Sequence, residues 1–517
     1  MRERRRRIGV TVAAVLLFLA LSPALPGEST AGIAAPGRDL PPPLNLTLPV
    51  EEALCRRMSV REFTGEDIGG AELATLCWAA YGTAHGRRTV AQVAASYGVV
   101  MYVLTAEGAF VYDGLNHSLL PFRRGDHRWV GQYDTAAVKL ALVWDRHACS
   151  DENVASTVIG EMGQNVYLAA VALGLGTVTT ASQVGQLRLL GLPPGQVPKI
   201  IMPVGPPAQP CPFTHQPLEG PLPPVENSTM PLSDALEQRR EGLAWQGTTL
   251  TGEEQARLVW AAYGYSRYLD EQGKRHRTVP SSHGTYPLRI FAVNASGVYE
   301  YLPARHALDE GRPGDHRPAV GGATRRFVAE APLIVIPVLN TSRVDPRVPW
   351  PWYYEGGAAA HNVLLEATAL NLSAAVVSVV NHSALRQVLG LPQGHLPLLV
   401  VPAGRERPVT DDMPPAVALL QPEEGVLLVM GRPVIPLPGD LAVVIGPLAA
   451  QATASDDYGL QAVKWQVDGR MVGLQQQTPY RVRLPASLPL GVHVLTVRAV
   501  DYGDNAAVVN LRYVKAG

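Results

Sequence analysis

Hydrophobic residues near the start of the globular part of the chain recur three and four positions apart, the spacing of a helix with one buried face. Val50, Ala53 and Leu54 share such a face, and a second helix is predicted from Ala71 to Tyr81. Gly82 follows that helix directly, and glycine commonly ends helices because it lacks a Cβ. We therefore expect two consecutive short helices.

After these helices the apolar runs become shorter. Strands are expected around Tyr102 and Val111, and a long apolar helix from Gln164 to Leu173 that ends at Gly174. The run KIIMPVG at 199–205 is continuously apolar, as expected of a strand in a sheet covered on both faces. This mixture of helices and strands predicts an α+β domain.

The whole series of elements occurs twice along the chain. Five segments match in order: PVEEALCRRMSVREF from 49 with PLSDALEQRREGLAW from 231, WAAYG at 78 and 260, GDHR at 125 and 314, QNVYLAAVALGLG from 164 with HNVLLEATALNLS from 361, and LLGLPPGQVPKIIMPVG from 189 with VLGLPQGHLPLLVVPAG from 388. The period is too long for a solenoid and indicates duplication of a complete domain. We expect repeat 1 at 46–208 and repeat 2 at 229–408, joined by a proline-rich linker at 209–228.

Residues 413–517 have a different pattern, in which apolar and polar residues alternate in short runs separated by Gly, Pro and Asp. The alternation predicts an all-β sandwich. Its sequence resembles an immunoglobulin-like module of microbial surface proteins. The aspartates of its turns either bind Ca²⁺ or cap the turns, which is their commoner role, so no metal site is predicted. These residues are Asp456, Asp457, Asp501 and Asp504.

Composition narrows the class of protein. The 517 residues include 44 basic and 45 acidic side chains, so the net charge is −1 and no overall field attracts nucleic acid. Hydrophobic residues make up 47 %, which excludes a disordered chain. At ~100–200 residues per domain, the length corresponds to about three or four domains.

Residues 1–30 have the order of an export signal, with arginines first, then an apolar run and then small residues. The run approaches the length of a membrane span, so a cleaved signal peptide and a membrane anchor are both open. Seven of the 12 asparagines lie in the N-x-S/T glycosylation signal. We expect an extracytoplasmic glycoprotein, secreted or on the cell surface. The seven are Asn45, Asn116, Asn227, Asn294, Asn340, Asn371 and Asn381.

The four cysteines, Cys55, Cys77, Cys149 and Cys211, do not have the spacing of a metal site. In an oxidising compartment, Cys55 and Cys77 on consecutive helices are the pair expected to form a disulfide. Two buried free thiols are the alternative.

A candidate binding motif follows the first helix, where Arg57-Met58-Ser59-Val60-Arg61 places two arginines around a hydroxyl. Guanidinium groups bind phosphate oxygens in pairs, and serine adds a short donor. Repeat 2 carries a different cluster, TVPSSHGTYP at 278–287, in which small residues let backbone N–H groups approach a flat ligand. Either motif alone also fits an ordinary polar turn.

With these motifs on a duplicated α+β domain, the sequence resembles the nitroreductase superfamily of FMN-dependent oxidoreductases. The resemblance rests on ALCRRMSVREF, WAAYG, TVPSSHGTYPL, GDHR, GQNVYLAAVALGLGTVTT and LLGLPPGQVPKIIMPVG. The PSSHGTYP and GDHR segments are similar to the branch that dehydrogenates azolines in modified peptides. The family binds FMN at the interface of a dimer, so the resemblance implies that the two repeats form a pseudo-dimer within one monomeric chain.

The resemblance also implies positions for the FMN. The arginine–serine motif would hold the phosphate and ribitol, the threonines after the long helix would lie near N5, and the proline–serine loop of repeat 2 would face the flavin. The residues are Arg57, Met58, Ser59, Arg61, Thr179, Thr180, Pro280, Ser281 and Ser282. His283 is a candidate donor to substrate or flavin. No obligatory acid–base pair is expected, because the chemistry belongs to the cofactor.

Each repeat has only one of the two candidate binding motifs: repeat 1 has the arginine–serine motif, and repeat 2 has the proline–serine loop. In repeat 2, Glu241 replaces Ser59 and Leu243 replaces Arg61, and a carboxylate beside a phosphate is repulsive. Repeat 1 in turn has AQVA where repeat 2 has PSSH. We expect one working composite site, built from the first-half arginines and the second-half loop, and one inactive site.

Further residues have two interpretations. Family members often carry a basic residue after the last strand, but PPA follows Gly205, so either the affinity for FMN is reduced or Arg56 compensates. Glu161 on the long helix either acts in the site or is solvated. The aromatic residues that precede the second long helix either line the pocket or belong to the core, and they are Trp350, Trp352, Tyr353 and Tyr354.

These observations predict an exported FMN-dependent oxidoreductase. Hydride or electrons would pass in a ping-pong reaction from an unknown donor to an unknown small-molecule or peptide substrate. The alternative is a catalytically inactive surface protein for adhesion or binding, which the partial loss of motifs and the C-terminal module favour.

Overall fold

The computed structural model describes residues 37–91, 93, 97–407, 412–456, 460–475, 478–485, 488–501 and 505–516. The expected export segment at 1–30 lies outside these residues. Among the helices within the described ranges, none combines the length and apolarity that crossing a membrane requires.

Repeat 1 is built on an antiparallel sheet with the strand order β1-β6-β5-β4-β7-β9-β8. One face packs against the long helices, and the other packs against the segment Val184–Leu190. Strand β9 is therefore buried on both sides, as its continuous apolar run predicts. The elements are β1 (Arg38–Asp39), α2 (Val50–Arg56), α3 (Gly70–Tyr81), β2 (Thr83–Ala84), β3 (Arg87–Arg88), β4 (Val99–Leu104), β5 (Gly108–Asp113), β6 (Ser118–Arg124), β7 (Val138–Asp145), α4 (Glu152–Ala172), β8 (Gly176–Thr177) and β9 (Gln196–Gly205).

Repeat 2 has a corresponding sheet, β15-β14-β13-β17-β21-β18, with β16, β19 and β20 paired at its sides. Its outer face is covered by α7 and α9. The elements are α5 (Leu232–Gln238), α6 (Gly252–Tyr263), β11 (Tyr265–Leu269), β12 (Arg275–Arg277), β13 (Leu288–Asn294), β14 (Gly297–Leu302), β15 (Ala307–Leu308), β16 (Arg312–Pro313), α7 (Arg317–Ala323), β17 (Leu333–Asn340), α8 (Trp350–Ala369), β18 (Ser373–Ala374), β19 (Val377–Ser378), α9 (His382–Val388), β20 (His395–Pro397) and β21 (Leu399–Gly404).

The predicted elements of repeat 1 are present, but the long helix is longer than expected. Helix α4 begins at Glu152 rather than Gln164, because the Asp151 side chain accepts hydrogen bonds from Asn153 N and Val154 N and caps the helix there. Strands β6 and β7 were not predicted. Helix α3 ends at Gly82 as predicted, although the backbone there is extended.

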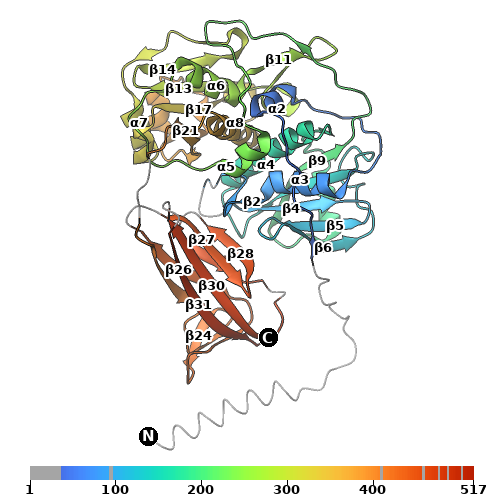
Figure 1. The fold of residues 1–517 in the computed structure, drawn as a ribbon, viewed down its shortest axis with the longest axis vertical. Coiled ribbons are helices and arrows are strands. Elements are labelled where there is room, and N and C mark those ends of the chain that lie inside the picture. The colour runs from blue at the N-terminus through green and yellow to red at the C-terminus, as the bar shows by residue number, and fades with distance from the viewer. Residues whose placement is uncertain are drawn as a thin grey trace, which may run out of the picture. The chain divides into compact units, whose positions relative to one another are not determined.

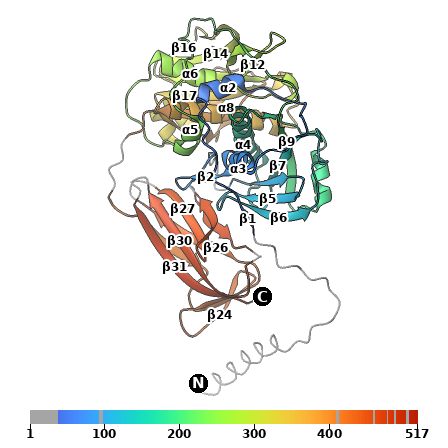
Figure 2. The same ribbon diagram turned by 45° about the vertical axis from the view of Figure 1, so that its right-hand side comes forward.

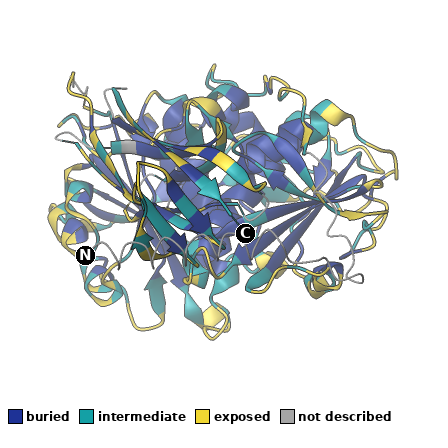
Figure 3. Ribbon diagram, turned by 90° about the horizontal axis from the view of Figure 1, so that it is seen from below, coloured by how far each residue is buried: buried dark blue, intermediate teal, exposed yellow. Residues whose placement is uncertain are grey.

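Helices α4 and α8 cross at the centre of the molecule, between the two sheets (Figures 1 and 2). Two glycines allow the close approach: a Cβ on Gly160 would overlap the Tyr354 carbonyl oxygen, and a Cβ on Gly357 would overlap the Thr157 carbonyl oxygen. The two contacts are related by the duplication. Buried residues fill the sheets and the helices between them (Figure 3), and one hydrophobic cluster runs through both repeats.

Asparagines one turn farther along each helix fix the same crossing with hydrogen bonds. The Nδ2 atom of Asn165 donates to two carbonyls of repeat 1, and that of Asn362 donates to the matching pair in repeat 2. Each Oδ1 atom therefore accepts from the opposite repeat: His361 Nε2 donates to Asn165 at 2.7 Å, and Gln164 Nε2 to Asn362 at 2.8 Å. The four carbonyls belong to Ala79, Thr89, Ala261 and Thr278.

The predicted linker at 209–228 contains a strand of its own and contacts repeat 2. Its strand β10 (Thr214–His215) pairs with β11, whose edge would otherwise be open. Farther on, Asn227 accepts a hydrogen bond from Arg267, whose Nη1 atom also donates to Val225 O at 2.8 Å. The linker is thereby fastened to repeat 2.

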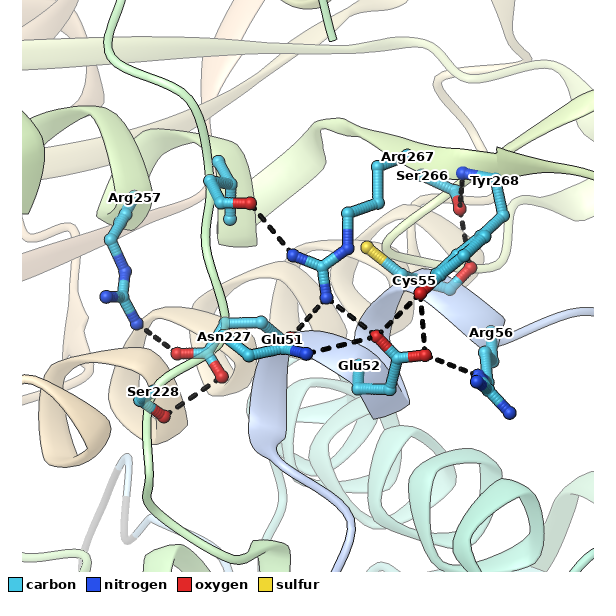
Figure 4. Close-up of polar contacts among 11 residues, drawn as sticks. Glu51, Glu52, Cys55, Arg56, Asn227, Ser228, Arg257, Ser266, Arg267 and Tyr268 are labelled. Carbon is cyan, nitrogen blue, oxygen red and sulfur yellow. Dashed lines mark hydrogen bonds and ion pairs between the residues drawn. The ribbon is translucent and has the colours of Figure 1, made fainter. Parts of the chain in front are cut away.

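A buried ionic network under the linker joins α2 to repeat 2 (Figure 4). Glu52 accepts from Arg267 at 2.7 Å and from Tyr268 at 2.8 Å, while Glu51 pairs with Arg257. Burial alone would raise the pKa of Glu52, but the hydrogen bonds from Arg267, Tyr268 and Arg56 hold that pKa below its usual value. The network therefore keeps a charged carboxylate between the repeats.

The predicted disulfide between Cys55 and Cys77 is wrong, and the alternative of buried free thiols holds. All four cysteines are free, and both of these lie in the core. Burial raises the pKa of the Cys55 thiol to about 11, so it stays protonated.

The C-terminal region consists of two sheets, as a sandwich pattern predicts. The three-stranded sheet has the order β22-β26-β29, and the seven-stranded sheet has the order β24-β23-β25-β31-β30-β27-β28, with parallel pairs at β25. Asp501 caps a turn by accepting from Asn505 N at 2.8 Å, whereas Asp457 and Asp504 lie outside the described residues. The strands are β22 (Ala416–Gln421), β23 (Val426–Val429), β24 (Arg432–Pro436), β25 (Ala442–Ile445), β26 (Ala449–Ser455), β27 (Leu460–Val467), β28 (Arg470–Gln475), β29 (Tyr480–Arg483), β30 (Gly491–Asp501) and β31 (Ala506–Lys515). The immunoglobulin-like resemblance stays a prediction.

The helix crossing makes a prediction for stability. Gly160→Ala should lower the free energy of unfolding by about 3 kcal/mol, because the new methyl group overlaps backbone that cannot move aside. Gly252→Ala is the matched control, since no atom lies within 4 Å of its Cβ position, and should change stability by less than about 0.5 kcal/mol. Urea unfolding measures both, and equal effects would contradict the crossing as described.

The buried network makes a prediction for pH. Burial, with Glu51 nearby, raises the pKa of Glu366 to about 8, although Arg257 Nε donates to it at 2.7 Å. The folded protein then keeps a proton that the unfolded chain releases, so this contribution to stability is present at pH 5 and is lost as the pH rises to 8. Glu366→Gln should remove about 3 kcal/mol of that pH dependence in urea unfolding at pH 5 and 8. Parallel curves for both proteins would contradict the prediction.

Candidate functional site

Arg57 at the end of α2 reaches from repeat 1 into repeat 2. Its side chain is 2 % exposed, its Nε atom donates to Arg277 O at 3.1 Å, and its guanidinium lies 5.0 Å from the centre of the Tyr167 ring. Arg277 directly precedes the loop that begins at Thr278. The first half of the arginine motif and the second-half loop therefore meet at one place.

A chain of hydroxyl groups continues from this point. Ser59 Oγ lies 3.1 Å from Tyr167 Oη, which accepts a hydrogen bond from Thr179 N at 2.8 Å. Thr179 Oγ1 is 2.7 Å from Tyr354 Oη on α8 of repeat 2. Burial raises the pKa of Tyr354, so its hydroxyl stays neutral. Two predicted residues of repeat 1, Ser59 and Thr179, are thus joined through Tyr167, and Thr179 continues the chain to Tyr354 of repeat 2.

Ser281, in the loop of repeat 2 that begins at Thr278, makes a second set of contacts. Its Oγ atom donates to Glu355 Oε2 at 2.7 Å and accepts from Tyr286 N at 2.9 Å. The other oxygen of Glu355 accepts from the Tyr263 hydroxyl. Burial raises the pKa of Glu355 to about 7, with the hydrogen bonds from Tyr263 and Ser281 acting in the opposite direction.

Arg277 is held among three tyrosines. Its guanidinium lies 4.4 Å from the centre of the Tyr265 ring and 4.9 Å from those of Tyr263 and Tyr286, and it donates to Tyr263 O at 3.0 Å. This stacking fixes the backbone carbonyl that receives Arg57. We call the whole group the composite site, and its members are Arg57, Ser59, Tyr167, Thr179, Arg277, Ser281, Tyr354 and Glu355.

The donors at the composite site suit an anionic ligand such as the phosphate of FMN. Arg57 Nη1 is buried and has no hydrogen-bond partner among the described residues. An unpartnered buried guanidinium N–H favours a negatively charged acceptor. A cleft of about 410 Å³ is lined by the next five residues, Met58 to Glu62, by the segment between Pro207 and Pro212, and by the turn between Asp270 and His276.

The equivalent place on the other side of the molecule is closed. Arg239 corresponds to Arg57, but its Nη1 atom pairs with Glu241 at 3.1 Å and its Nη2 atom donates to Arg88 O at 2.9 Å and Val90 O at 3.3 Å. We had expected Glu241 to repel a phosphate. In the structure the Glu241 carboxylate pairs with Arg239 and neutralises its charge. The carboxylate therefore occupies the place beside the arginine that an anionic ligand would need.

Glu161 lies at this second interface, which we define by Arg239, Glu241, Glu161 and His361. It is fully buried, which excludes the solvated interpretation. Its Oε2 atom accepts from Ala91 N at 2.6 Å and lies 3.7 Å from His361 Nδ1. Burial raises the pKa of Glu161 and lowers that of His361, so both are neutral.

Other predicted residues take no part in these contacts. Thr180 Oγ1 donates to Gln132 at 3.1 Å within repeat 1, Pro280 is buried, and Ser282 is exposed. His283 is exposed with φ +52°. Met58 lines the cleft, and Arg61 is exposed and donates to Ser59 O at 3.3 Å.

The suggestion that Arg56 compensates for a missing basic residue is wrong. Its Nε atom pairs with Glu52 at 2.5 Å and its guanidinium lies over the Tyr268 ring, so the side chain is engaged in the network under the linker. The four aromatic residues expected before the second long helix lie in the first turns of α8, and of these Tyr354 joins the composite site, through Thr179.

Sequence reasoning missed Tyr167, Arg277 and Glu355 of the composite site, and Tyr286, which donates to Ser281. Tyr167 and Tyr286 stand inside quoted motifs, QNVYLAAVALGLG and TVPSSHGTYP, but an apolar helix position and a turn position carry no sign of their contacts. Glu355 follows Tyr354 on an otherwise apolar helix. A carboxylate in a buried run was the available signal, because such a group needs partners.

Comparison with known proteins agrees with this architecture. The family model described as the nitroreductase family matches residues 54–206 and 245–405, once in each repeat. A protein of Methanocaldococcus jannaschii described as a candidate nitroreductase is 34 % identical over 200 residues, which are 36 % of this chain and 95 % of the relative.

The comparison with solved structures supports the fold through one of them, with a TM-score above 0.5. A candidate nitroreductase from Anabaena variabilis covers 74 % of this chain and 96 % of its own, with 13 % identity and a TM-score of 0.52. An FMN-dependent nitroreductase of Clostridium difficile covers 34 % of this chain and 88 % of its own, with 14 % identity and a TM-score of 0.25.

Proposed function

Because the chain belongs to the nitroreductase family, we propose that it is an FMN-dependent oxidoreductase with a single flavin site, formed by residues of both repeats. The family supports an oxidoreductase, and the number and position of flavin sites follow from the contrast between the two interfaces.

One observation carries the proposal: Arg57 and Arg239 are equivalent, yet only Arg239 has a carboxylate partner. Arg239 pairs with Glu241, whereas Arg57 has Ser59 at the matching position and an unpartnered Nη1 atom. An anionic ligand would supply the missing partner of Arg57, whereas the charge of Arg239 is already neutralised by Glu241 and only its Nε atom lacks a hydrogen-bond partner among the described residues. The inactive-scaffold alternative gives no reason for this difference.

The residues of the composite site divide into three roles. Arg57, Ser59 and Arg61 would bind the phosphate, with Arg61 closing over it from the exposed side. Thr179 and Ser281 would present hydroxyl groups to the ring system from opposite repeats, beside Thr180 and Pro280. Tyr167, Tyr286 and Tyr354 would exclude water. When bound, FMN supplies hydride and electron transfer, which side chains cannot perform.

The reaction partners and location are also proposals. In the proposed ping-pong exchange, an electron donor and a small-molecule or peptide substrate react in turn at the composite site. The export pattern at 1–30 and the glycosylation signals favour a location outside the cytoplasm, secreted or at the cell surface. There the donor would have to be other than cytoplasmic NAD(P)H.

Titration with FMN tests the proposed function. The purified full chain should bind one FMN per chain, with quenching of the flavin fluorescence. Two equivalents would contradict the closed second interface. A protein that binds no FMN would contradict the oxidoreductase and would support a surface-binding role.

A single substitution should transfer the closed arrangement to the composite site. Ser59→Glu copies Glu241, so the new carboxylate should pair with Arg57 and weaken FMN binding by at least 100-fold, or about 3 kcal/mol. Arg61→Leu, which copies Leu243, should weaken binding less, by about tenfold, because Arg61 is exposed.

The matched control is Glu241→Ser at the second interface. It should leave both the FMN affinity and the stoichiometry unchanged, because the loop of that interface lacks the proline and serines of repeat 2. Circular dichroism and thermal unfolding verify that all three variants are folded. Equal loss of FMN in Ser59→Glu and Glu241→Ser would overturn the assignment.

A further inference from the structure

Glu355 is a buried carboxyl group that the proposed reaction does not use. It is 1 % exposed and forms no ion pair with the described residues. Both of its oxygens accept hydrogen bonds, from Tyr263 and from Ser281 of the loop that lines the composite site. In the proposed function Ser281 presents its hydroxyl group to the flavin, so that hydroxyl group would lie between Glu355 and the ligand.

The fold does not require a carboxyl group at this position. The duplication aligns Glu355 on α8 with Val158 on α4, which is fully buried at the equivalent point of the same helix crossing. An apolar side chain of smaller size therefore fits there. Glu161, the buried carboxyl group of the second interface, is bonded to a backbone N–H, whereas Glu355 is bonded to a serine of the predicted flavin loop, and this contact points to a role in the composite site.

The groups around Glu355 act in opposite directions, some favouring its protonated form and others its ionised form. From α6 it faces Tyr263, and from the segment 275–287 it faces Ser281, Tyr286 and Arg277. Its own helix adds Tyr354, and Arg57 of repeat 1 acts on the same tyrosines. Desolvation favours the protonated form, while the two donated hydrogen bonds and Arg277 favour the ionised form.

We infer that Glu355 couples ligand binding in the composite site to the uptake of one proton, so that the site binds an anionic flavin more tightly when Glu355 is protonated. The inference rests on the proposed function, because FMN is the ligand that brings the negative charge. Like charges in a dry site repel, so binding of the anion and ionisation of Glu355 oppose each other. By linkage, the ligand then draws a proton onto the carboxyl group.

Protonation would also change the donor that the site offers. An ionised Glu355 only accepts, so the Ser281 hydroxyl donates to it. A protonated Glu355 can donate to Ser281 Oγ instead, which turns the serine hydrogen toward the ligand. Proton uptake would thus remove a negative charge and free a donor at the same time.

The experiment compares FMN affinity at pH 7 and pH 8.5 in the full chain and in Glu355→Gln. The affinity of the unaltered protein should fall about tenfold more than that of the variant over this range, with titration of the FMN phosphate cancelling in the comparison. Calorimetry in two buffers of different ionisation enthalpy should report uptake of up to one proton at pH 8 by the unaltered protein and none by the variant.

Two further variants keep the test decisive. Glu355→Val copies Val158 and should lose the pH dependence in the same way, which separates the effect from misfolding of the glutamine variant. Glu161→Gln removes the buried carboxyl group of the second interface and should retain the pH dependence of the unaltered protein. Riboflavin, which has the same ring system but no phosphate, shows which part of the ligand Glu355 senses.

The outcomes are distinct. FMN binding with the same pH dependence in the unaltered protein and in Glu355→Gln overturns the inference and leaves the proposed function standing. Absence of FMN binding at every pH overturns the proposed function and the inference with it. A loss of pH dependence in Glu161→Gln as well would assign the proton uptake to the core as a whole rather than to Glu355.

Discussion

The crossing of α4 and α8 is the contact on which the rest of the structure depends. Gly160 and Gly357 bring the two backbones together, and Asn165 and Asn362 then each bind one helix carbonyl and one loop carbonyl of their own repeat while receiving a donor from the other. Buried side-chain networks of this kind specify one arrangement because every alternative leaves polar groups unsatisfied. The register of the two halves is therefore fixed from within.

That fixed register decides where chemistry can occur. Helix α8 presents Tyr354 to Thr179 of the opposite repeat and Glu355 to the loop of its own repeat, and α4 presents Tyr167 to the end of α2. Neither repeat could assemble the composite site alone. The same geometry on the other side holds Glu161 and His361, two neutral groups enclosed in the core, beside an arginine that is already neutralised.

Much of this organisation could be predicted from the sequence. The duplication, the helices around Val50 and Gln164, and the strand before Gly205 follow from apolar spacing, which local sequence determines. The first turns of α4 and the strand in the linker could not be predicted, because the cap at Asp151 and the open edge of β11 depend on neighbours in space. The pairing of Cys55 with Cys77 failed for the same reason, since adjacency along the chain does not bring two thiols together.

The segment 214–228 of the linker, which fastens the linker to repeat 2, has a consequence for how the sequences of the two repeats diverge in evolution. In an assembly of separate identical chains, any substitution appears in both binding sites at once, so a change that spoils one spoils the other. Here the linker joins the two repeats covalently, so that each repeat has one fixed partner at a high effective concentration. Selection can then act on the two halves independently, and the two interfaces have diverged in this way: Arg239 pairs with Glu241, whereas Arg57 has a serine at the matching position.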